Sequence, residues 1–171
     1  RRTTRRPFSA SVTIIALIPA HNEAERITAT VEATLRIPSI DRILVVDDAS
    51  TDNTSAIAHT AGAETLTLLQ NVGKGAALDA GLAQVADDAD VLLLLDGDLG
   101  ETAEQASALL NPLLHGEADM TVAMFPRPNQ KAGFGLVKGL ARYRIARMGD
   151  GSIANAPLSG QRALSRAAWS R

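Results

Sequence analysis

The stretch Val91-Leu92-Leu93-Leu94-Leu95-Asp96-Gly97-Asp98 decides the fold of this chain. Its apolar part has the length and composition of a strand that is buried on both faces. Strand periodicity then places Asp96 and Asp98 on one face, with Gly97 between them leaving room for a ligand. In open α/β sheets ligands bind beyond the carboxyl ends of the strands. We therefore expect a binding site at the end of this strand.

The segments on either side of this strand alternate between the periodicities of strands and of helices. Further strands are predicted over 12–18, 43–46, 65–69 and 120–125. Helices are predicted over 23–36, 51–61, 75–85, 102–114 and 161–169, with a basic amphipathic helix over 133–148 and a loop over 149–160. Alternation with short connections predicts an α/β fold, in which a single doubly wound, mostly parallel sheet is flanked by helices.

The composition favours one domain and excludes several classes of protein. Of 171 residues, 46% are hydrophobic and 3% aromatic, so Ala, Leu, Val and Ile must build the core. The absence of cysteine excludes a disulfide framework and a thiolate metal site, and favours a reducing, cytoplasmic location. The longest apolar run, 91–95, falls far short of the ~20 residues of a membrane-spanning helix. Residues 1–11 lack periodicity and are predicted to form a flexible arm.

The formal net charge of −2 conceals a separation of charge along the chain. Residues 7–119 carry 4 basic and 18 acidic side chains, whereas residues 120–171 carry 9 basic side chains and a single acid, Asp150. An acidic body can hold a cation and a basic segment can contact an anion, so we expect two surfaces with different partners. The alternative is that the basic segment is a solvated helix.

Polar residues also follow the first two predicted strands. Pro19-Ala20-His21-Asn22-Glu23 ends the first, and Asn22 with Glu25 fits a capping box for the next helix. The same helix start could offer backbone N–H groups to a ligand, and Glu23 could accept from a ribose or a base. The second strand ends in Asp47-Asp48, whose side chains point to opposite faces. We expect one of them to be structural and the other to face a ligand.

The segment Asn71-Val72-Gly73-Lys74-Gly75-Ala76-Ala77 places a lysine between two glycines at a helix start. Glycines let the backbone approach a ligand closely, and the ammonium of Lys74 is a point charge suited to phosphate. Asp96 and Asp98 offer the hard carboxylate oxygens that suit Mg²⁺ or Mn²⁺, ions that keep several waters and share phosphate oxygens of a substrate. No metal-binding spacing links the three histidines, His21, His59 and His115.

Taken together, these motifs resemble those of family 2 glycosyltransferases with the GT-A fold, in the same order and spacing over residues 12–125. Residues 157–164 look like the Ser-Gly-x-Arg-Ala segment of the dolichol-phosphate-mannose-synthase-like and glucosyl-phosphoglycerate-synthase-like branches. The resemblance implies one catalytic domain over 12–171. Its nucleotide-sugar half would cover 12–125, and a basic acceptor-side segment would cover 126–171.

The resemblance also implies roles for particular residues. The nucleotide would be bound by Pro19, Ala20, His21, Glu23, Asp48, Lys74, Asp96 and Gly97. The divalent metal, Mg²⁺ or Mn²⁺, would be held by Asp98, with Asp96 contributing directly or through a water. The acceptor would lie near Gly160, Gln161 and Arg162. No catalytic base can be assigned, and we expect that it lies beyond Arg171 and that the chain is incomplete at this end.

The family reaction inverts the sugar, because an acceptor oxygen attacks the anomeric carbon opposite the departing nucleoside diphosphate. The resemblance implies a nucleoside-diphosphate sugar as donor, with UDP favoured over GDP. The charge of residues 120–171 implies an anionic acceptor, either a polyprenyl phosphate or a small phosphorylated or carboxylated metabolite. The basic and apolar residues of 133–148 favour the lipid and a peripheral contact at the inner face of a membrane. No nucleic-acid partner is expected.

Three alternatives differ from this hypothesis in identifiable ways. A phosphorelay receiver would open with the acidic strand at 43–48, but here a strand and a helix precede it. A sugar nucleotidylyltransferase would have a glycine-rich, basic loop after the first strand, where this chain has residues 19–23. A protein that binds a sugar nucleotide without catalysis would share the motifs, and measured turnover would separate it from an enzyme.

Overall fold

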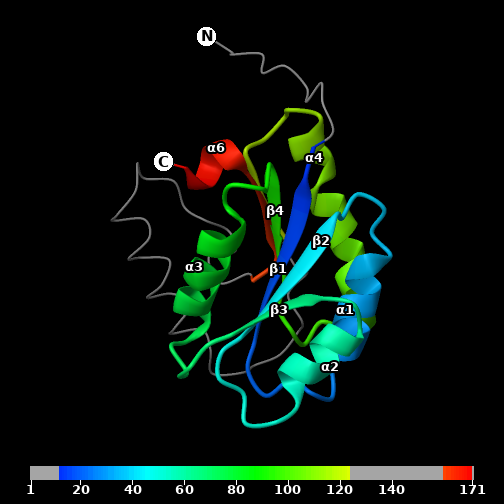
Figure 1. Cartoon of the computed structure of the whole chain (residues 1–171). Helices are drawn as coiled ribbons and strands as arrows, with labels where there is room; N and C mark the ends of the chain where they lie inside the picture. The colour runs from blue at the N-terminus through cyan, green and yellow to red at the C-terminus, as the bar shows by residue number, and fades with distance from the viewer. Residues whose placement is uncertain (1–11, 124–159, 171) are drawn as a thin grey trace, which may run out of the picture.

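A computed structural model describes residues 12–123 and 160–170 (Figure 1). These form a six-stranded sheet in the order β3-β2-β1-β4-β6-β5. The strands are β1 (Ile14–Ala20), β2 (Arg42–Asp47), β3 (Glu64–Thr67), β4 (Val91–Leu94), β5 (Met120–Val122) and β6 (Arg162–Ser165). The helices are α1 (Ile27–Leu35), α2 (Thr54–Thr60), α3 (Lys74–Val85), the 3₁₀ helix η1 (Gly100–Leu109), α4 (Asn111–Leu114) and α6 (Arg166–Trp169).

The sheet is doubly wound, as the alternating sequence predicts. β3, β2, β1 and β4 pair in parallel, and helices cover both faces. α3 packs on one face against β1 and β2, while α1 and η1 pack together on the other. Figure 1 shows α3 and α1 on opposite sides of the central strands. The parallel strands therefore end together at one edge, where a ligand can reach all of them.

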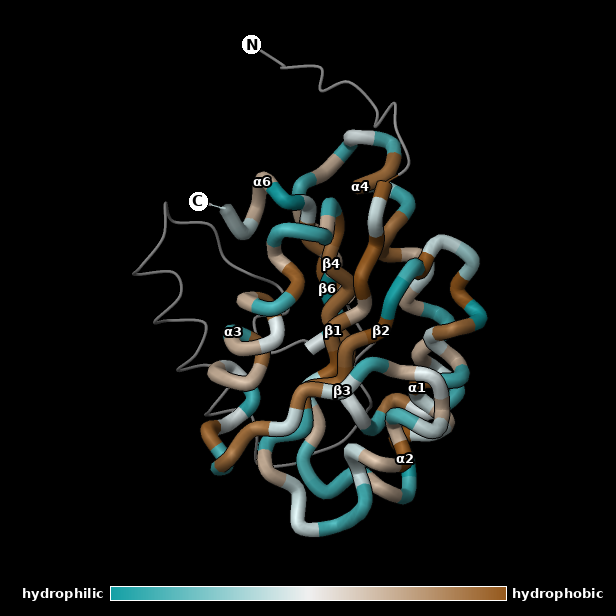
Figure 2. Tube along the Cα trace, viewed as in Figure 1, coloured by the Kyte–Doolittle hydropathy of each residue, from teal (hydrophilic) through white to brown (hydrophobic). Residues whose placement is uncertain are grey.

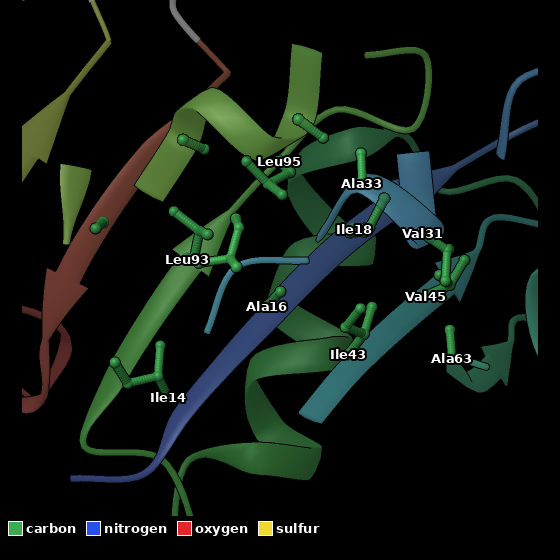
Figure 3. Packing of buried hydrophobic residues seen from close by; sticks show 14 of the residues in the cluster. Ile14, Ala16, Ile18, Val31, Ala33, Ile43, Val45, Ala63, Leu93 and Leu95 are labelled. Carbon is green, nitrogen blue, oxygen red and sulfur yellow. The ribbon is translucent and has the colours of Figure 1, made fainter. Parts of the chain in front are cut away.

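The core lies on both faces of β1, and all seven residues of this strand are buried. Ile14, Ala16 and Ile18 pack toward the α1 face, and Ile15 and Leu17 pack toward α3. Figure 3 shows the first group between β2 and β4, and Figure 2 shows the central strands as the most hydrophobic part of the molecule. Each fully buried isoleucine stabilises the fold by roughly 1.5–3 kcal/mol.

The predicted helix over 161–169 is wrong in its first half. Residues 162–165 form β6, which pairs antiparallel with β4 on one side and with β5 on the other. Ala163 and Ser165 are buried, while Arg162 and Leu164 are only half-buried, so burial alternates with the period of a strand. Backbone hydrogen bonds to strands on both sides outweigh the local preference of these residues for a helix. Only α6 (Arg166–Trp169) is helical.

Two other helix predictions also need correction. The predicted capping box is absent, because Asn22 adopts a left-handed conformation with φ of 55° and α1 begins only at Ile27. The helix predicted over 102–114 is divided into η1 and α4. Pro112 lacks the N–H that a continuous helix would need at this point, which accounts for the division.

Several predicted segments lie outside the described residues. They include the arm over 1–11, the basic amphipathic helix over 133–148 and the loop over 149–159, while the predicted strand over 120–125 is described only to residue 123. Among the described residues, no helix has the length and apolar character needed to cross a membrane.

Candidate functional site

A cavity of about 350 Å³ opens at the carboxyl ends of β1, β2 and β4. It is lined by Pro19, Ala20, His21, Glu23, Asp48, Lys74, Asp96, Gly97 and Asp98. These are all eight residues predicted for the nucleotide, together with the predicted metal ligand. The structure therefore brings together motifs that are separated along the chain by whole strands and helices.

Two left-handed residues shape the rim where β1 and β2 end. Asn22 and Ala49 both have φ of 55°, a conformation that costs a non-glycine residue of the order of 1 kcal/mol or more. Hydrogen bonds hold the two turns together. The backbone N–H of Asn22 donates to Ser50 Oγ at 2.9 Å, and the backbone N–H of Thr51 donates to Asn22 Oδ1 at 2.8 Å. The side chain of Asn22 thus stabilises the rim and not a helix cap.

The two adjacent aspartates of β2 and its end have different partners. Asp47 Oδ1 accepts from the backbone N–H of Ser50 at 3.0 Å, which is a structural role. Asp48, only 4% exposed, lines the cavity, and its two oxygens accept from the backbone N–H groups of Val72 and Gly73 at 2.8 Å. Asp48 therefore fixes the glycine loop next to the cavity.

Lys74 enters the cavity from this loop. Gly73 has φ of +84°, which glycine adopts readily, and α3 begins directly after it at Lys74. Lys74 Nζ forms an ion pair with Asp96 Oδ1 across the cavity. The lysine side chain remains about half exposed, so its ammonium is accessible to an anion that enters.

Asp96 is also contacted by the predicted acceptor segment. Gln161 Nε2 donates to Asp96 Oδ2 at 2.8 Å, and Gly160 lies so close that a Cβ at this position would overlap the carboxyl group of Asp96. Glycine is therefore required here by close approach. Arg162 lies in β6 opposite Leu94 and is not among the residues that line the cavity. Two of the three predicted acceptor residues thus reach the site.

Arg26 is a site residue that the sequence did not reveal. Its Nη1 lies 3.7 Å from Asp98 Oδ2, and its Nε lies 3.4 Å from Glu23 Oε2. A cation just before α1 faces the positive end of the helix dipole, which is unfavourable. That misplaced charge, three residues after Glu23, is the signal that could have identified it.

The carboxylates around the cavity are compatible with a divalent cation. Asp98 is half exposed, and Glu23 Oε2 is buried without a hydrogen-bond partner. Within residues 12–123 and 160–170, no group of three or more His, Cys, Asp or Glu side chains is arranged to hold a metal ion. Mg²⁺ is usually bound by one or two carboxylates, waters and substrate phosphates, so the donor set fits an ion that shares a diphosphate.

A carboxylate beside the rim has an altered affinity for protons. Asp52 Oδ1 accepts from the hydroxyl and the backbone N–H of Thr54, and Oδ2 accepts from the backbone N–H of Ala24. The hydroxyl bond is the main reason why the pKa of Asp52 is lowered. Asp52 therefore stays ionised and links the turn after β1 to the start of α2.

Comparison with known proteins identifies relatives of this chain. The family model described as Glycosyl transferase family 2 matches residues 15–157. Protein RfbJ of Shigella flexneri is 34% identical over 113 residues, which are 66% of this chain and 84% of that protein. Glycosyltransferase AglJ of Haloferax volcanii is 36% identical over 106 residues, which are 60% of this chain and 33% of that protein.

Solved structures agree with the sequence comparison. The structure of glucosyl-3-phosphoglycerate synthase from Mycobacterium tuberculosis with Mn²⁺, uridine-diphosphate-glucose and phosphoglyceric acid has a TM-score of 0.73 and 27% identity. The match covers 96% of this chain and 64% of that one. The chain thus spans less than two thirds of this structural relative and a third of AglJ. By its sequence motifs, its mixed six-stranded sheet and the extent of the family match, the chain belongs to glycosyl transferase family 2 and has the GT-A fold.

Proposed function

We propose that this chain binds a nucleoside-diphosphate sugar, with UDP favoured over GDP, and transfers the sugar to an anionic acceptor with inversion. The observation that carries the proposal is the single cavity in which the family motifs meet at the ends of β1, β2 and β4. The solved relative that holds Mn²⁺, uridine-diphosphate-glucose and phosphoglyceric acid supports it.

In this proposal the nucleoside lies between the ends of β1 and β2. Pro19, Ala20 and His21 line that side of the cavity, and Glu23 is available to accept from a ribose or base donor. Asp48 takes part in two ways, because it lines the cavity and holds the glycine loop through Val72 and Gly73. In this proposal an oxygen of Asp48 also accepts a hydrogen bond from an N–H group of the base.

The diphosphate lies between Lys74 and the carboxylates after β4. Lys74 Nζ is paired with Asp96, and a diphosphate in the cavity would offer it a second, more highly charged partner. Asp98 would hold Mg²⁺ or Mn²⁺, with Asp96 in support. When bound, such a cation neutralises the charge that develops on the departing diphosphate. Glu23 and Arg26, which precede α1, add a negative and a positive charge near Asp98.

The acceptor approaches from the side of residues 160–162. Gly160 and Gln161 contact Asp96, so this segment adjoins the diphosphate end of the cavity. Arg162 is proposed to contact the acceptor anion, because its planar fork matches phosphate oxygens. The solved relative binds phosphoglyceric acid, which favours a small phosphorylated acceptor. A polyprenyl phosphate at a membrane surface is the alternative, favoured by the basic residues of 133–148.

The test combines calorimetry with a transfer assay. UDP and GDP are titrated into the protein with Mn²⁺ and with EDTA, and UDP release from UDP-glucose is then measured with 3-phosphoglycerate or with polyprenyl phosphate in vesicles. We expect UDP binding that depends on the metal and UDP release that depends on the acceptor. The acceptor that supports release distinguishes a small phosphorylated metabolite from a lipid phosphate. Binding without turnover on either acceptor would leave a sugar-nucleotide-binding protein, and no nucleotide binding would overturn the proposal.

A further inference from the structure

Thr30 connects helix α1 to the turn that follows β4. Its side chain is fully buried, at 0% exposure, in the middle of α1. The hydroxyl donates to the backbone oxygen of Gly97 at 2.9 Å and accepts from the backbone N–H of Gly100 at 2.9 Å. One side chain therefore satisfies two backbone groups on either side of Asp98, far away in sequence.

An ordinary role for a threonine within a helix is to donate back to the carbonyl one turn earlier. Thr34, one turn further along α1 and equally buried, does this, because its hydroxyl donates to the Thr30 oxygen at 2.7 Å. Thr30 Oγ1 lies 3.3 Å from the Arg26 oxygen, farther than from Gly97. Since a hydroxyl has one proton, the shorter contact takes it.

The turn between β4 and η1, which Thr30 contacts, is closely packed on its other side. A Cβ on Gly97 would lie 3.3 Å from Ala20 Cβ and 3.4 Å from the Pro19 oxygen, so this backbone is already packed against the end of β1. Gly100, where η1 begins, has a φ of +56°, a conformation that glycine adopts readily. The side chain of Asp98 is half exposed, and its ion pair to Arg26 is 3.7 Å long. Its position is therefore set through the backbone of the turn.

We infer that Thr30 is a positioning residue for Asp98, and this inference rests on the proposed metal role of that carboxylate. The buried hydroxyl fixes the carbonyl before Asp98 and the amide after Leu99, and so presents Asp98 to the cavity. Removing the hydroxyl would leave the buried carbonyl of Gly97 and the partly buried N–H of Gly100 without this partner, and the turn would move to satisfy them. Metal binding requires ligands held in place, so metal-dependent affinity is the property that depends on this clamp.

The test compares Thr30→Val with Thr34→Val, which removes an equally buried hydroxyl from the same helix without touching the turn. Calorimetry measures UDP affinity with Mn²⁺ and with EDTA, and thermal melts measure folding. We expect Thr30→Val to reduce the Mn²⁺-dependent gain in affinity at least about tenfold, with EDTA values within about twofold of the parent. Thr34→Val should keep the full gain, and Thr30→Ser, which retains the hydroxyl, should restore most of it.

Two results would overturn the inference: a full Mn²⁺-dependent gain in Thr30→Val, or an equal loss in both valine variants. Asp98→Asn separates this from the proposed function, because a gain that survives in Asp98→Asn removes the metal role itself. If Thr30→Val does not fold, amide hydrogen exchange of Gly100 in the parent protein still decides. Slow exchange supports the clamp, and exchange at the rate of an unstructured peptide contradicts it.

Discussion

The two ends of the parallel sheet use acidic residues in opposite ways. At the amino ends, Asp41 Oδ2 accepts from the backbone N–H of Ile14 at 2.7 Å, and Asp90 Oδ2 accepts from that of Thr13 at 3.0 Å. At the carboxyl ends, Asp98 has a single long ion pair among the contacts described, and Glu23 Oε2 is buried without a hydrogen-bond partner. Asp48 and Asp96 at this end are also hydrogen-bonded, so the contrast lies in Asp98 and Glu23, whose side-chain polar contacts within the described residues are long ion pairs to Arg26.

Arg42 shows how acidic side chains at the amino end are paired with a cation of the fold. Its guanidinium donates to both oxygens of Glu64, at 2.7 and 2.9 Å, and to Asp88 at 2.8 Å. The hydrogen bonds to Glu64 and then Asp88 raise the pKa of Arg42, and the bond to Arg42 lowers the pKa of Glu64. These charges are engaged in contacts between the elements of the fold.

The sharpest test of this comparison is Asp98→Asn. We expect the loss of most metal-dependent nucleotide affinity, on the order of 3 kcal/mol, because one charged partner of a bound ion is removed. The melting temperature should stay close to that of the parent, since Asp98 is half exposed. Calorimetry with and without Mn²⁺ measures the first and a thermal melt the second. Unchanged metal-dependent affinity would show that the ion lies elsewhere.

Asp48→Ala should affect both the nucleotide and the loop. Two partly buried hydrogen bonds to Val72 and Gly73 disappear, so we expect nucleotide affinity to fall by about 2 kcal/mol even without metal. Lys74→Ala should weaken diphosphate binding and leave nucleoside binding intact. If both variants bind UDP like the parent, the cavity at the ends of β1, β2 and β4 is not the nucleotide site.

Asp41→Ala tests the amino end of the sheet. In contrast to Asp98→Asn, it should lower stability and leave nucleotide affinity unchanged. It leaves the buried N–H of Ile14 without its acceptor, which should lower the free energy of unfolding by about 1–2 kcal/mol. Asp41→Asn, which keeps a side-chain oxygen, should cost less. Nucleotide affinity should not change in either variant. Urea unfolding and calorimetry on the same samples would contradict the comparison if affinity fell together with stability.

Arg42→Met should have the smallest effect, about 1 kcal/mol or less, because the ion pairs are partly exposed. The effect should depend on pH. The folded-state pKa of Glu64 is lowered, so its contribution is present above the ordinary glutamate pKa and is lost as the pH falls through the lowered value. Melts over a pH series should show the difference between parent and variant shrinking in acid. A constant difference would remove the ionic explanation.

Local patterns were sufficient to predict the parallel sheet, and the resemblance of the motifs to a known family supplied the residues of the cavity. The strands over residues 14–20, 42–47 and 91–94 lie where hydrophobic periodicity places them, and parallel strands must end at one edge. The capping box predicted at Asn22 is absent because its side-chain oxygen accepts a hydrogen bond from the backbone N–H of Thr51 in a neighbouring turn. No local sequence pattern encodes this contact. The same holds for β6, which takes its conformation from pairing with β4 and β5.

The sequence did not reveal the contacts of Thr30 and Arg26 for a second reason. Thr30 looks like an ordinary residue of an amphipathic helix, and its partners Gly97 and Gly100 lie far along the chain. Arg26 carries a charge in the wrong place for a helix start, so it could have been flagged but not assigned. The residues that line the cavity were predicted, whereas the residues that hold them in place needed the three-dimensional structure.

The place of β6 between β4 and β5 has a consequence for the way the chain folds during synthesis. β4 and β5 leave the ribosome first, and the edge of β4 that faces away from β1 stays unpaired until β6 arrives. Until then the apolar strand β4 exposes backbone groups that can pair with another chain, which is a route to aggregation. The large separation of β5 and β6 along the sequence also slows this step. Because Gly160 and Gln161 immediately precede β6, their contacts with Asp96 form only with this late pairing.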